Sequence, residues 1–225
     1  MNNCQIIAYH GWGFGADFWN SWRQSLSKVG TFQAVDRGYF NAPNQVGVNK
    51  KDNPVVFVAH SLGLHMIDKA LFKEVDLLVV IGGFMHFHPY TAQHKRRSRF
   101  VLQEMINDLE VHPKETLQKF YENCFAPQDP PENEIPDINH ELLIEDLNAL
   151  QISERKPETL HKADRICIIH GADDHIVPNK KGRQIYNQCQ KKAQYFELKD
   201  AGHALPITNH KQCIEFVTPL IRQLS

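Results

Sequence analysis

The chain has 225 residues, enough for one medium-sized domain or for a core with an insertion. Hydrophobic residues make up 42% and charged residues 23%, as expected for a globular protein with a single well-buried core. The 25 basic residues nearly balance the 26 acidic ones, which argues against nucleic acid or a membrane surface as the main partner.

The five cysteines are scattered along the chain and form no Cys-x-x-Cys pair, which argues against a zinc knuckle or a disulfide framework. This cysteine usage favours a reducing compartment, and we expect a cytoplasmic protein. We see no charged leader before an apolar stretch, and no apolar run long enough to span a bilayer. We therefore expect no signal peptide and no membrane span, and we expect a monomer.

The first predicted strand covers residues 5–9 and leads into His-Gly-Trp-Gly at residues 10–13. Glycines there let the backbone turn sharply and bring amide groups close to a ligand. An amphipathic helix is predicted next over residues 17–28, and a second strand over residues 32–35. That strand ends in Asp-Arg-Gly-Tyr-Phe at residues 36–40, before a polar, turn-rich stretch.

Residues 55–60 form a short apolar run rich in β-branched residues, which predicts a buried parallel strand. The run ends at Ser61 and passes into a predicted helix over residues 62–72. A serine at a sharp strand-to-helix turn is typical of the nucleophile elbow of serine hydrolases. Ala59 stands where that motif usually has its first glycine, and we expect the extra methyl group to distort the elbow only slightly. Alternatively, Ser61 merely caps the helix.

A further strand is predicted over residues 77–81, and from Phe84 the chain becomes helical and highly charged until residue 166. This change indicates a helical cap at residues 84–159 inserted into a core formed by residues 1–83 and 160–225. One cap helix is predicted over residues 94–109 and another over residues 138–150, separated by a proline-rich acidic loop. Their predicted apolar stripes are Phe100, Val101, Met105 and Leu109, and Leu142, Leu143, Leu147 and Leu150.

The core resumes with predicted strands at residues 165–169 and 193–198, each followed by a loop with polar residues. Alternating strands and helices predict an α/β fold: a mainly parallel sheet of about six strands with helices on both faces. Ser61, Asp174 and His203 then follow three strands, in the order expected of an α/β-hydrolase. Because ligand loops collect at the carboxyl ends of parallel strands, these residues can converge.

The roles follow from acid–base chemistry. His203 would take the proton of Ser61, and Asp174 would orient the imidazole and stabilise its charged form. The backbone amides of Trp12 and Leu62 would form the oxyanion hole. Asp173 is a rival for the acid, but the spacing to the following proline favours Asp174. Other histidines near the motifs do not follow the last strand as His203 does: His60, His170, His175 and His210.

The chain resembles the α/β-hydrolase superfamily, and within it the carboxylesterases that demethylate pimeloyl-carrier-protein methyl ester in biotin synthesis. The resemblance rests on residues 10–13, on Ser-Leu-Gly at 61–63, on Asp174 with Val-Pro at 177–178, on His-Ala at 203–204 and on the leucine spacing of 138–153. It implies a serine esterase without a cofactor, acting on an acyl ester bound to an acyl carrier protein. Because such carriers are acidic, basic residues of the cap would dock them; the candidates are Lys95, Arg96, Arg97 and Arg99.

Three other readings remain open. A general short-chain esterase, thioesterase or C–C hydrolase of the same fold would use the same triad, with Trp12, Phe14 and Phe84 lining an apolar acyl pocket. A non-catalytic ligand-binding protein would not need all three triad residues. A metal enzyme could use His86 and His88, although alternating histidines at the entrance of a cap are more often unliganded, and we expect no metal.

Overall fold

The computed structural model describes residues 4–50, 53–132 and 134–224. Its centre is a six-stranded sheet in the order β2-β1-β3-β4-β5-β6, with every neighbouring pair parallel. This confirms the predicted α/β fold. The strands are β1 (Cys4–Tyr9), β2 (Gly30–Val35), β3 (Val55–His60), β4 (Leu77–Ile81), β5 (Arg165–Gly171) and β6 (Ala193–Leu198).

The strand order reverses between β1 and β3, because the chain first adds β2 on one side of β1 and then β3 on the other. Loops after adjacent strands leave in opposite directions at such a point, so that a ligand site forms outside the carboxyl ends of the strands. The loop at residues 10–13 and Ser61 follow these two strands. Topology thus brings both motifs to one place.

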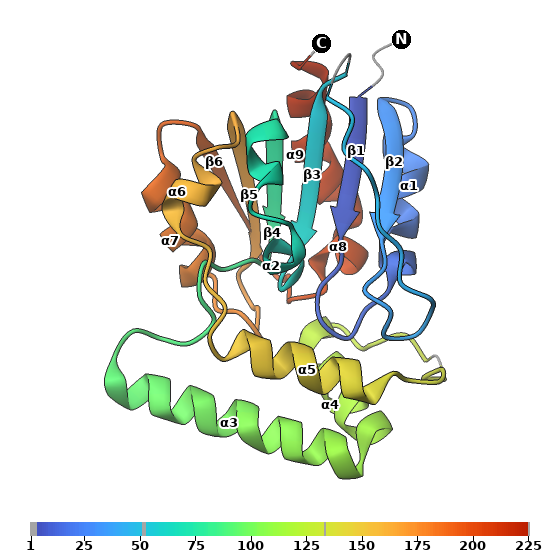
Figure 1. Cartoon of the computed structure of the whole chain (residues 1–225), viewed down its shortest axis with the longest axis vertical. Coiled ribbons are helices and arrows are strands. Elements are labelled where there is room, and N and C mark those ends of the chain that lie inside the picture. Colours follow the sequence, from blue (N-terminus) through green and yellow to red (C-terminus); the bar gives the residue numbers. More distant parts are fainter. Residues whose placement is uncertain (1–3, 51–52, 133, 225) are drawn as a thin grey trace.

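Helices cover both faces of the sheet, and each face has its own apolar core (Figure 1). In the middle of the sheet, β3 and β4 are each buried along their whole length, which explains their nearly continuous apolar sequences. One face is covered by the 3-10 helix η1 (Ala16–Trp19), α1 (Asn20–Leu26), α8 (Leu205–Thr208) and α9 (His210–Arg222). The other is covered by α2 (Gly63–Met66), the 3-10 helix η2 (Leu71–Glu74), α6 (Pro157–Leu160) and α7 (Lys180–Cys189).

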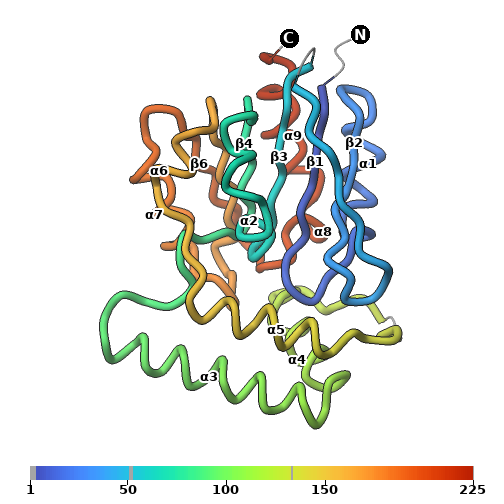
Figure 2. Tube along the Cα trace, viewed as in Figure 1, coloured from blue at the N-terminus to red at the C-terminus, as the bar shows by residue number. Residues whose placement is uncertain are grey.

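Three further helices lie between β4 and β5 in the chain: α3 (Ala92–Val111), α4 (Pro113–Phe125) and α5 (His140–Leu150). We call them the cap helices. They lie across the carboxyl ends of the strands (Figure 1), whereas β1 begins and α9 ends at the opposite side of the molecule (Figure 2). A third apolar cluster joins the cap helices to the core, and it includes Trp12, Leu62 and Phe84.

The prediction of a helix over residues 62–72 is wrong. α2 ends after a single turn at Met66, because Ile67 has an extended backbone (φ −67°, ψ 130°). The guanidinium of Arg155 explains the early end: it donates to the carbonyl oxygens of Leu64, His65 and Ile67. A side chain from a distant segment thereby satisfies carbonyls that the next turn of a helix would otherwise bind.

The prediction of the apolar stripe on α3 is wrong in part. Phe100 and Val101 are 65% and 59% exposed, whereas Leu109 is buried as predicted. The buried face instead contains Leu102 and Ile106 together with Leu109. Ile106 follows Leu102 by four residues and Leu109 follows Ile106 by three, so the three side chains lie on one face of the helix. The sequence of α3 allows either stripe, and its packing against α4 and α5 selects one of them. On α5, Leu143, Leu147 and Leu150 are buried as predicted.

Candidate active site

Ser61 occupies a strained turn between β3 and α2. Its φ of +53° lies in the left-handed region that non-glycine residues seldom adopt. Its N–H donates to the carbonyl of Ile81 at the end of β4 (3.0 Å), and its carbonyl accepts from Leu64 (3.3 Å). Ala59 is accommodated in the interior of β3, where it is fully buried. The local geometry is that of the predicted elbow.

Glycines permit the close packing around this turn. A Cβ atom on Gly63 would lie 2.4 Å from the carbonyl oxygen of Tyr9, so that only glycine lets α2 begin against the end of β1. A Cβ atom on Gly11 would lie 2.8 Å from the ring of His60 and 3.1 Å from the Cβ atom of Ser61. The loop after β1 therefore lies directly against Ser61.

Asp174 and His203 meet at the ends of β5 and β6. The Nδ1 atom of His203 lies 2.7 Å from the Oδ2 atom of Asp174, and both side chains are buried. The other carboxylate oxygen accepts hydrogen bonds from the backbone N–H groups of Ile176 (2.9 Å) and Val177 (2.7 Å). These contacts hold the carboxylate in one orientation toward the imidazole.

The surroundings of Asp174 keep it ionised. Burial alone would raise the pKa of its carboxyl group. The charge of His203, together with hydrogen bonding from His170 and His203, outweighs burial and holds that pKa well below its usual range. An ionised carboxylate at Nδ1 keeps the proton of His203 on that nitrogen, because the carboxylate can only accept. The Nε2 atom is then left as a proton acceptor.

His203 also lies beside the elbow. His60 precedes Ser61, and its ring lies 4.7 Å from the ring of His203. The Nε2 atom of His60 lies 3.0 Å from the carbonyl oxygen of His203. A Cβ atom on Gly82, in the loop after β4, would lie 3.3 Å from the Nδ1 atom of His203. The structure thus gathers Ser61, Asp174 and His203 at one edge of the sheet.

The rival residues have other surroundings. Asp173 is exposed, and His175 is exposed beside it. His210 contacts the carbonyl of Ile207 at the start of α9. His60 is fully buried, and burial and the charge of His203 lower its pKa well below the usual value, so that it stays neutral.

His170, for which the sequence predicted no role, supports Asp174. It is fully buried, and its Nε2 atom donates to the carbonyl of Val177 (2.8 Å) while lying 3.3 Å from the Oδ2 atom of Asp174. His170 therefore braces the loop that carries Asp174. Its place at the end of β5, four residues before Asp174, is the one sequence signal that could have indicated this.

The predicted oxyanion residues lie in the cluster that joins core and cap. Trp12 and Leu62 are 4% and 6% exposed. Among the described residues, neither of their backbone N–H groups donates a hydrogen bond. A buried N–H group without an acceptor costs free energy, and a substrate oxyanion would be such an acceptor. The geometry is therefore compatible with the predicted role of both amides.

The predicted substrate-binding residues separate into two places. Phe84 is buried in the same cluster as Trp12 and stacks on His65 (ring centroids 4.7 Å apart). Phe14 lines a cavity of about 390 Å³ between the loop after β1, α4 and the proline-rich loop. Trp12 and Phe84 thus share one apolar cluster, whereas Phe14 belongs to another, and its ring lies 5.9 Å from the ring of His60. The basic residues of α3 are all exposed: Lys95, Arg96, Arg97 and Arg99.

No group of three or more metal-ligating side chains occurs among the described residues. His88 contacts Ser98 (2.8 Å) and Gln151 (3.0 Å) through its two ring nitrogens, whereas His86 contacts the carbonyl of His88. In the described parts of the chain, no helix combines the length and the apolar character needed to cross a membrane.

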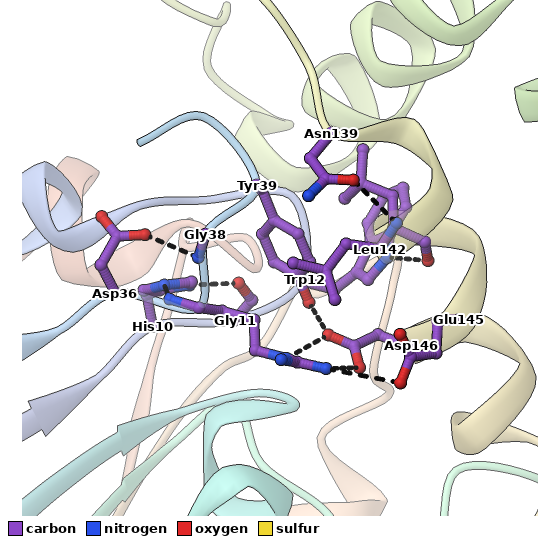
Figure 3. A network of polar contacts seen from close by, with 12 residues as sticks. His10, Gly11, Trp12, Asp36, Gly38, Tyr39, Asn139, Leu142, Glu145 and Asp146 are labelled. Atoms are coloured by element: carbon purple, nitrogen blue, oxygen red, sulfur yellow. Dashed lines mark hydrogen bonds and ion pairs between the residues drawn. The ribbon is translucent and has the colours of Figure 1, made fainter. Parts of the chain in front are cut away.

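A polar network that the sequence did not reveal joins the loop after β2 to α5 (Figure 3). The guanidinium of Arg37 makes two 2.9 Å bonds to the carboxylate of Asp146, and the hydroxyl of Tyr39 donates to the same group. Burial and the Asp146 carboxylate raise the pKa of Tyr39 well above its usual value, so its hydroxyl stays protonated and can donate. We call these three residues the latch.

The latch also reaches the loop that carries Trp12. The backbone N–H of Arg37 donates to the Nε2 atom of His10 (3.0 Å), and the indole N–H of Trp12 donates to the carbonyl of Leu143 (2.9 Å) (Figure 3). Leu143 lies one turn before Asp146 on α5. One helix of the cap therefore fixes both the side chain of Trp12 and the loop after β2.

Two buried cations anchor the segments that connect cap and core. Lys181 of α7 donates to the carbonyls of His86 (2.7 Å) and His88 (2.9 Å), and burial lowers its pKa to about 8. Arg155, on the returning segment, is 4% exposed and holds the end of α2, and its backbone N–H donates to Met85 (2.7 Å). One connection is therefore fixed to α7, and the other to α2, the helix that follows Ser61.

Replacing Arg155 by methionine is expected to lower the free energy of unfolding by about 2 kcal/mol, because buried carbonyls at the end of α2 lose their donor. Methionine also avoids the desolvation penalty of burying a cation, which offsets part of this loss of stability. Urea denaturation measures the change. The matched control is Lys156→Met, which removes the same charge from an exposed neighbour and should change stability by less than about 0.5 kcal/mol. Equal effects of the two substitutions would contradict the role given to Arg155.

A parallel sheet with these connections, a strained serine turn after its third strand and a capping helical segment define the α/β-hydrolase fold. Solved structures agree, although no protein-family model and no curated protein matches the sequence. A bromoperoxidase from Bacillus anthracis matches with a TM-score of 0.80 at 16% identity, over 99% of this chain and 92% of that one. The esterase EaEST from Exiguobacterium antarcticum matches with a TM-score of 0.76 at 14% identity, over 98% and 92%. MenH from S. aureus matches with a TM-score of 0.68 at 12% identity, over 99% and 95%. The chain has the α/β-hydrolase fold.

Proposed function

We propose that this protein is a serine hydrolase that cleaves carboxylic esters, with Ser61 as nucleophile, His203 as general base and Asp174 as the acid that orients it. The observation that carries the proposal is the 2.7 Å contact between Asp174 and His203, buried beside the strained turn that holds Ser61. Structural neighbours such as the esterase from Exiguobacterium antarcticum support the reaction class.

The geometry supports a two-step mechanism. The Nε2 atom of His203 takes the hydroxyl proton of Ser61 while the oxygen attacks the ester carbonyl. The amides of Trp12 and Leu62 stabilise the oxyanion, and each donor in such a site contributes roughly 3 kcal/mol. The protonated imidazole then gives its proton to the leaving alcohol. Water, activated by His203, hydrolyses the acyl-enzyme, releases the acid and restores the serine.

For the substrate we propose the methyl ester of a pimeloyl chain on an acyl carrier protein, as the sequence resemblance implies. Residues 84–159 would act as the cap over the site. The exposed cations of α3 support a negatively charged macromolecular partner. All five cysteines are unpaired and buried, which supports a reducing compartment, and we place the reaction in the cytoplasm.

The test compares hydrolysis of pimeloyl-carrier-protein methyl ester with hydrolysis of short p-nitrophenyl esters, using Ser61→Ala as the control. Fast cleavage of the carrier-protein ester that depends on Ser61 would support the full proposal. Cleavage of the small esters alone would keep the esterase and remove this substrate. Absence of Ser61-dependent cleavage of either would favour a ligand-binding protein with a hydrolase fold.

Charge reversal of Arg96 and Arg97 to glutamate is expected to lower kcat/KM for the carrier-protein ester by about tenfold at low salt, because the substitutions weaken electrostatic attraction of an acidic partner. Both side chains are exposed on α3, and neither belongs to the buried face of that helix. Hydrolysis of p-nitrophenyl esters should remain unchanged. An equal loss on both substrates would contradict carrier docking at these residues.

A further inference from the structure

His60 is a buried polar residue at the end of an otherwise apolar strand. Residues 55–59 of β3 are all hydrophobic, and every residue of the strand is buried, His60 included. Because side chains alternate between the two faces of a strand, His60 lies on the same face as Val56 and Val58, which α1 and α9 cover. A polar side chain in such a place costs free energy unless it is hydrogen-bonded. Its hydrogen bonds should therefore explain its presence.

The surroundings of the imidazole fix which nitrogen carries the proton. The Nε2 atom lies 3.0 Å from the carbonyl oxygen of His203, and a carbonyl oxygen can only accept. The Nδ1 atom has no hydrogen-bond partner among the described residues, and a Cβ atom on Gly11 would lie 2.8 Å from it. Burial and the charge of His203 lower the pKa of His60 well below its usual value, so the ring holds a single proton. That proton is on Nε2, which donates it to the carbonyl of His203.

The carbonyl of His203 needs this donor, because the turn that follows cannot supply one. Pro206, three residues further on, has no N–H group. The N–H of Ile207, the next residue, donates to the carbonyl of Ala204 instead (2.8 Å). His203 is 1% exposed, which leaves little access for water. His60 therefore satisfies a carbonyl that would otherwise be buried without a partner.

Neighbouring rings hold His60 in place. Phe18 stacks on the imidazole, with ring centroids 4.7 Å apart and planes 23° apart, and Phe14 meets it edge-on at 5.9 Å. A close-packed ring cannot move without displacing its neighbours, so its position follows that of the strand to which it belongs. Because Ser61 directly follows His60, the strand that leads into the nucleophile also binds the backbone of His203.

We propose that His60 is a positioning residue for the general base: its Nε2–H group holds the backbone of His203 and so sets the position of the base relative to Ser61. The assignment rests on the proposed function and deepens it. Asp174 orients the imidazole of His203 at Nδ1, whereas His60 holds the peptide group from which that side chain extends. His60 is fully buried, so its loss should affect the chemical step rather than substrate binding.

The experiment compares His60→Phe with His60→Gln. Phenylalanine keeps a flat ring but has no donor, whereas glutamine carries an amide N–H group in a position similar to that of Nε2. With a p-nitrophenyl ester, His60→Phe should lower kcat by roughly 10- to 100-fold, because small misplacements in an active site have losses of that size. KM should change by less than about twofold, since the substituted side chain does not bind substrate. His60→Gln should keep kcat within about threefold, because the carbonyl regains a donor.

His210→Phe is the matched control. The Nδ1 atom of His210 lies 3.0 Å from the carbonyl oxygen of Ile207, four residues beyond His203. This variant therefore removes an imidazole–carbonyl contact from the same segment without touching the base, and kcat should stay within about twofold. Equal losses of kcat in His60→Phe and His210→Phe would overturn the proposal. A loss in His60→Gln as large as that in His60→Phe, or an effect on KM alone, would also overturn it.

A second measurement does not depend on the reaction. NMR of protein with isotope-labelled histidine follows the Nδ1–H group of His203, which hydrogen bonds to Asp174. In His60→Phe this proton should exchange with water at least about tenfold faster, because the base opens more often, whereas His60→Gln and His210→Phe should preserve the slow exchange. Unchanged exchange in His60→Phe would contradict the positioning role. If the unsubstituted protein shows no Ser61-dependent hydrolysis, the proposed function fails, and this exchange rate alone decides the role of His60.

Discussion

Replacing Asp174 by asparagine is expected to lower kcat for ester hydrolysis by about 10⁴-fold with little change in KM. Asparagine is nearly isosteric with aspartate, but it is neutral and carries an amide that can donate to the imidazole. His203 would then lose the partner that holds its proton on Nδ1 and that stabilises the charged imidazole. Comparable substitutions in serine proteases have effects of this size because they favour the wrong tautomer. Steady-state kinetics with a p-nitrophenyl ester measure the loss.

The adjacent Asp173 provides the matched control. It is exposed, whereas Asp174 is buried and bonded to His203. Asp173→Asn removes the same charge one residue away and should leave kcat within about twofold. Far-ultraviolet circular dichroism of both variants would show whether the fold is kept. Similar losses in the two variants would mean that the assignment of the acid is wrong.

Replacing Asp146 by alanine is expected to lower the free energy of unfolding by about 3 kcal/mol. The substitution leaves the buried hydroxyl of Tyr39 without its acceptor and removes both hydrogen bonds of Arg37. Breaking a buried ion pair by removing one partner typically costs about 3–5 kcal/mol. We expect the lower end of that range, because the side chain of Arg37 is 35% exposed and water can replace part of the hydrogen bonding that its guanidinium loses. Urea denaturation monitored by tryptophan fluorescence measures the change.

Glu145 is the matched control for the latch. It precedes Asp146 on α5 and also lies near Arg37, at 3.9 Å, but its side chain is 72% exposed. Glu145→Ala should change stability by less than about 0.5 kcal/mol, as is usual for exposed ion pairs. If both variants unfold at the same urea concentration, the latch does not join cap and core in the way that the structure indicates.

The chain's local patterns were sufficient for the fold class. Strands β1, β3 and β4 are short apolar runs, and their hydrophobic periodicity needs no distant contact to be recognised. The elbow could be located because a serine before a glycine at a strand end is a local signal. The order of Ser61, Asp174 and His203 then indicated how three separate loops would meet, since carboxyl ends of parallel strands share one edge.

The departures from prediction all concern side chains that act across the chain. Arg155 ends α2 although 88 residues separate it from Ile67, and the local sequence after Gly63 still has helical spacing. Asp146 and Arg37 are 109 residues apart and carry no shared motif. Phe100 and Val101 looked like core residues because the stripe of a helix depends on which neighbours it packs against.

The sequence by itself therefore determined the layered α/β architecture and the candidate nucleophile, acid and base, because these depend on periodicity and on order along the chain. Only the tertiary structure decided how far α2 extends, how the latch fixes α5 over the site, and which side chain holds the backbone of His203. Those features depend on hydrogen bonds and packing between segments distant in sequence, and the energy of such contacts exists only once the chain has folded.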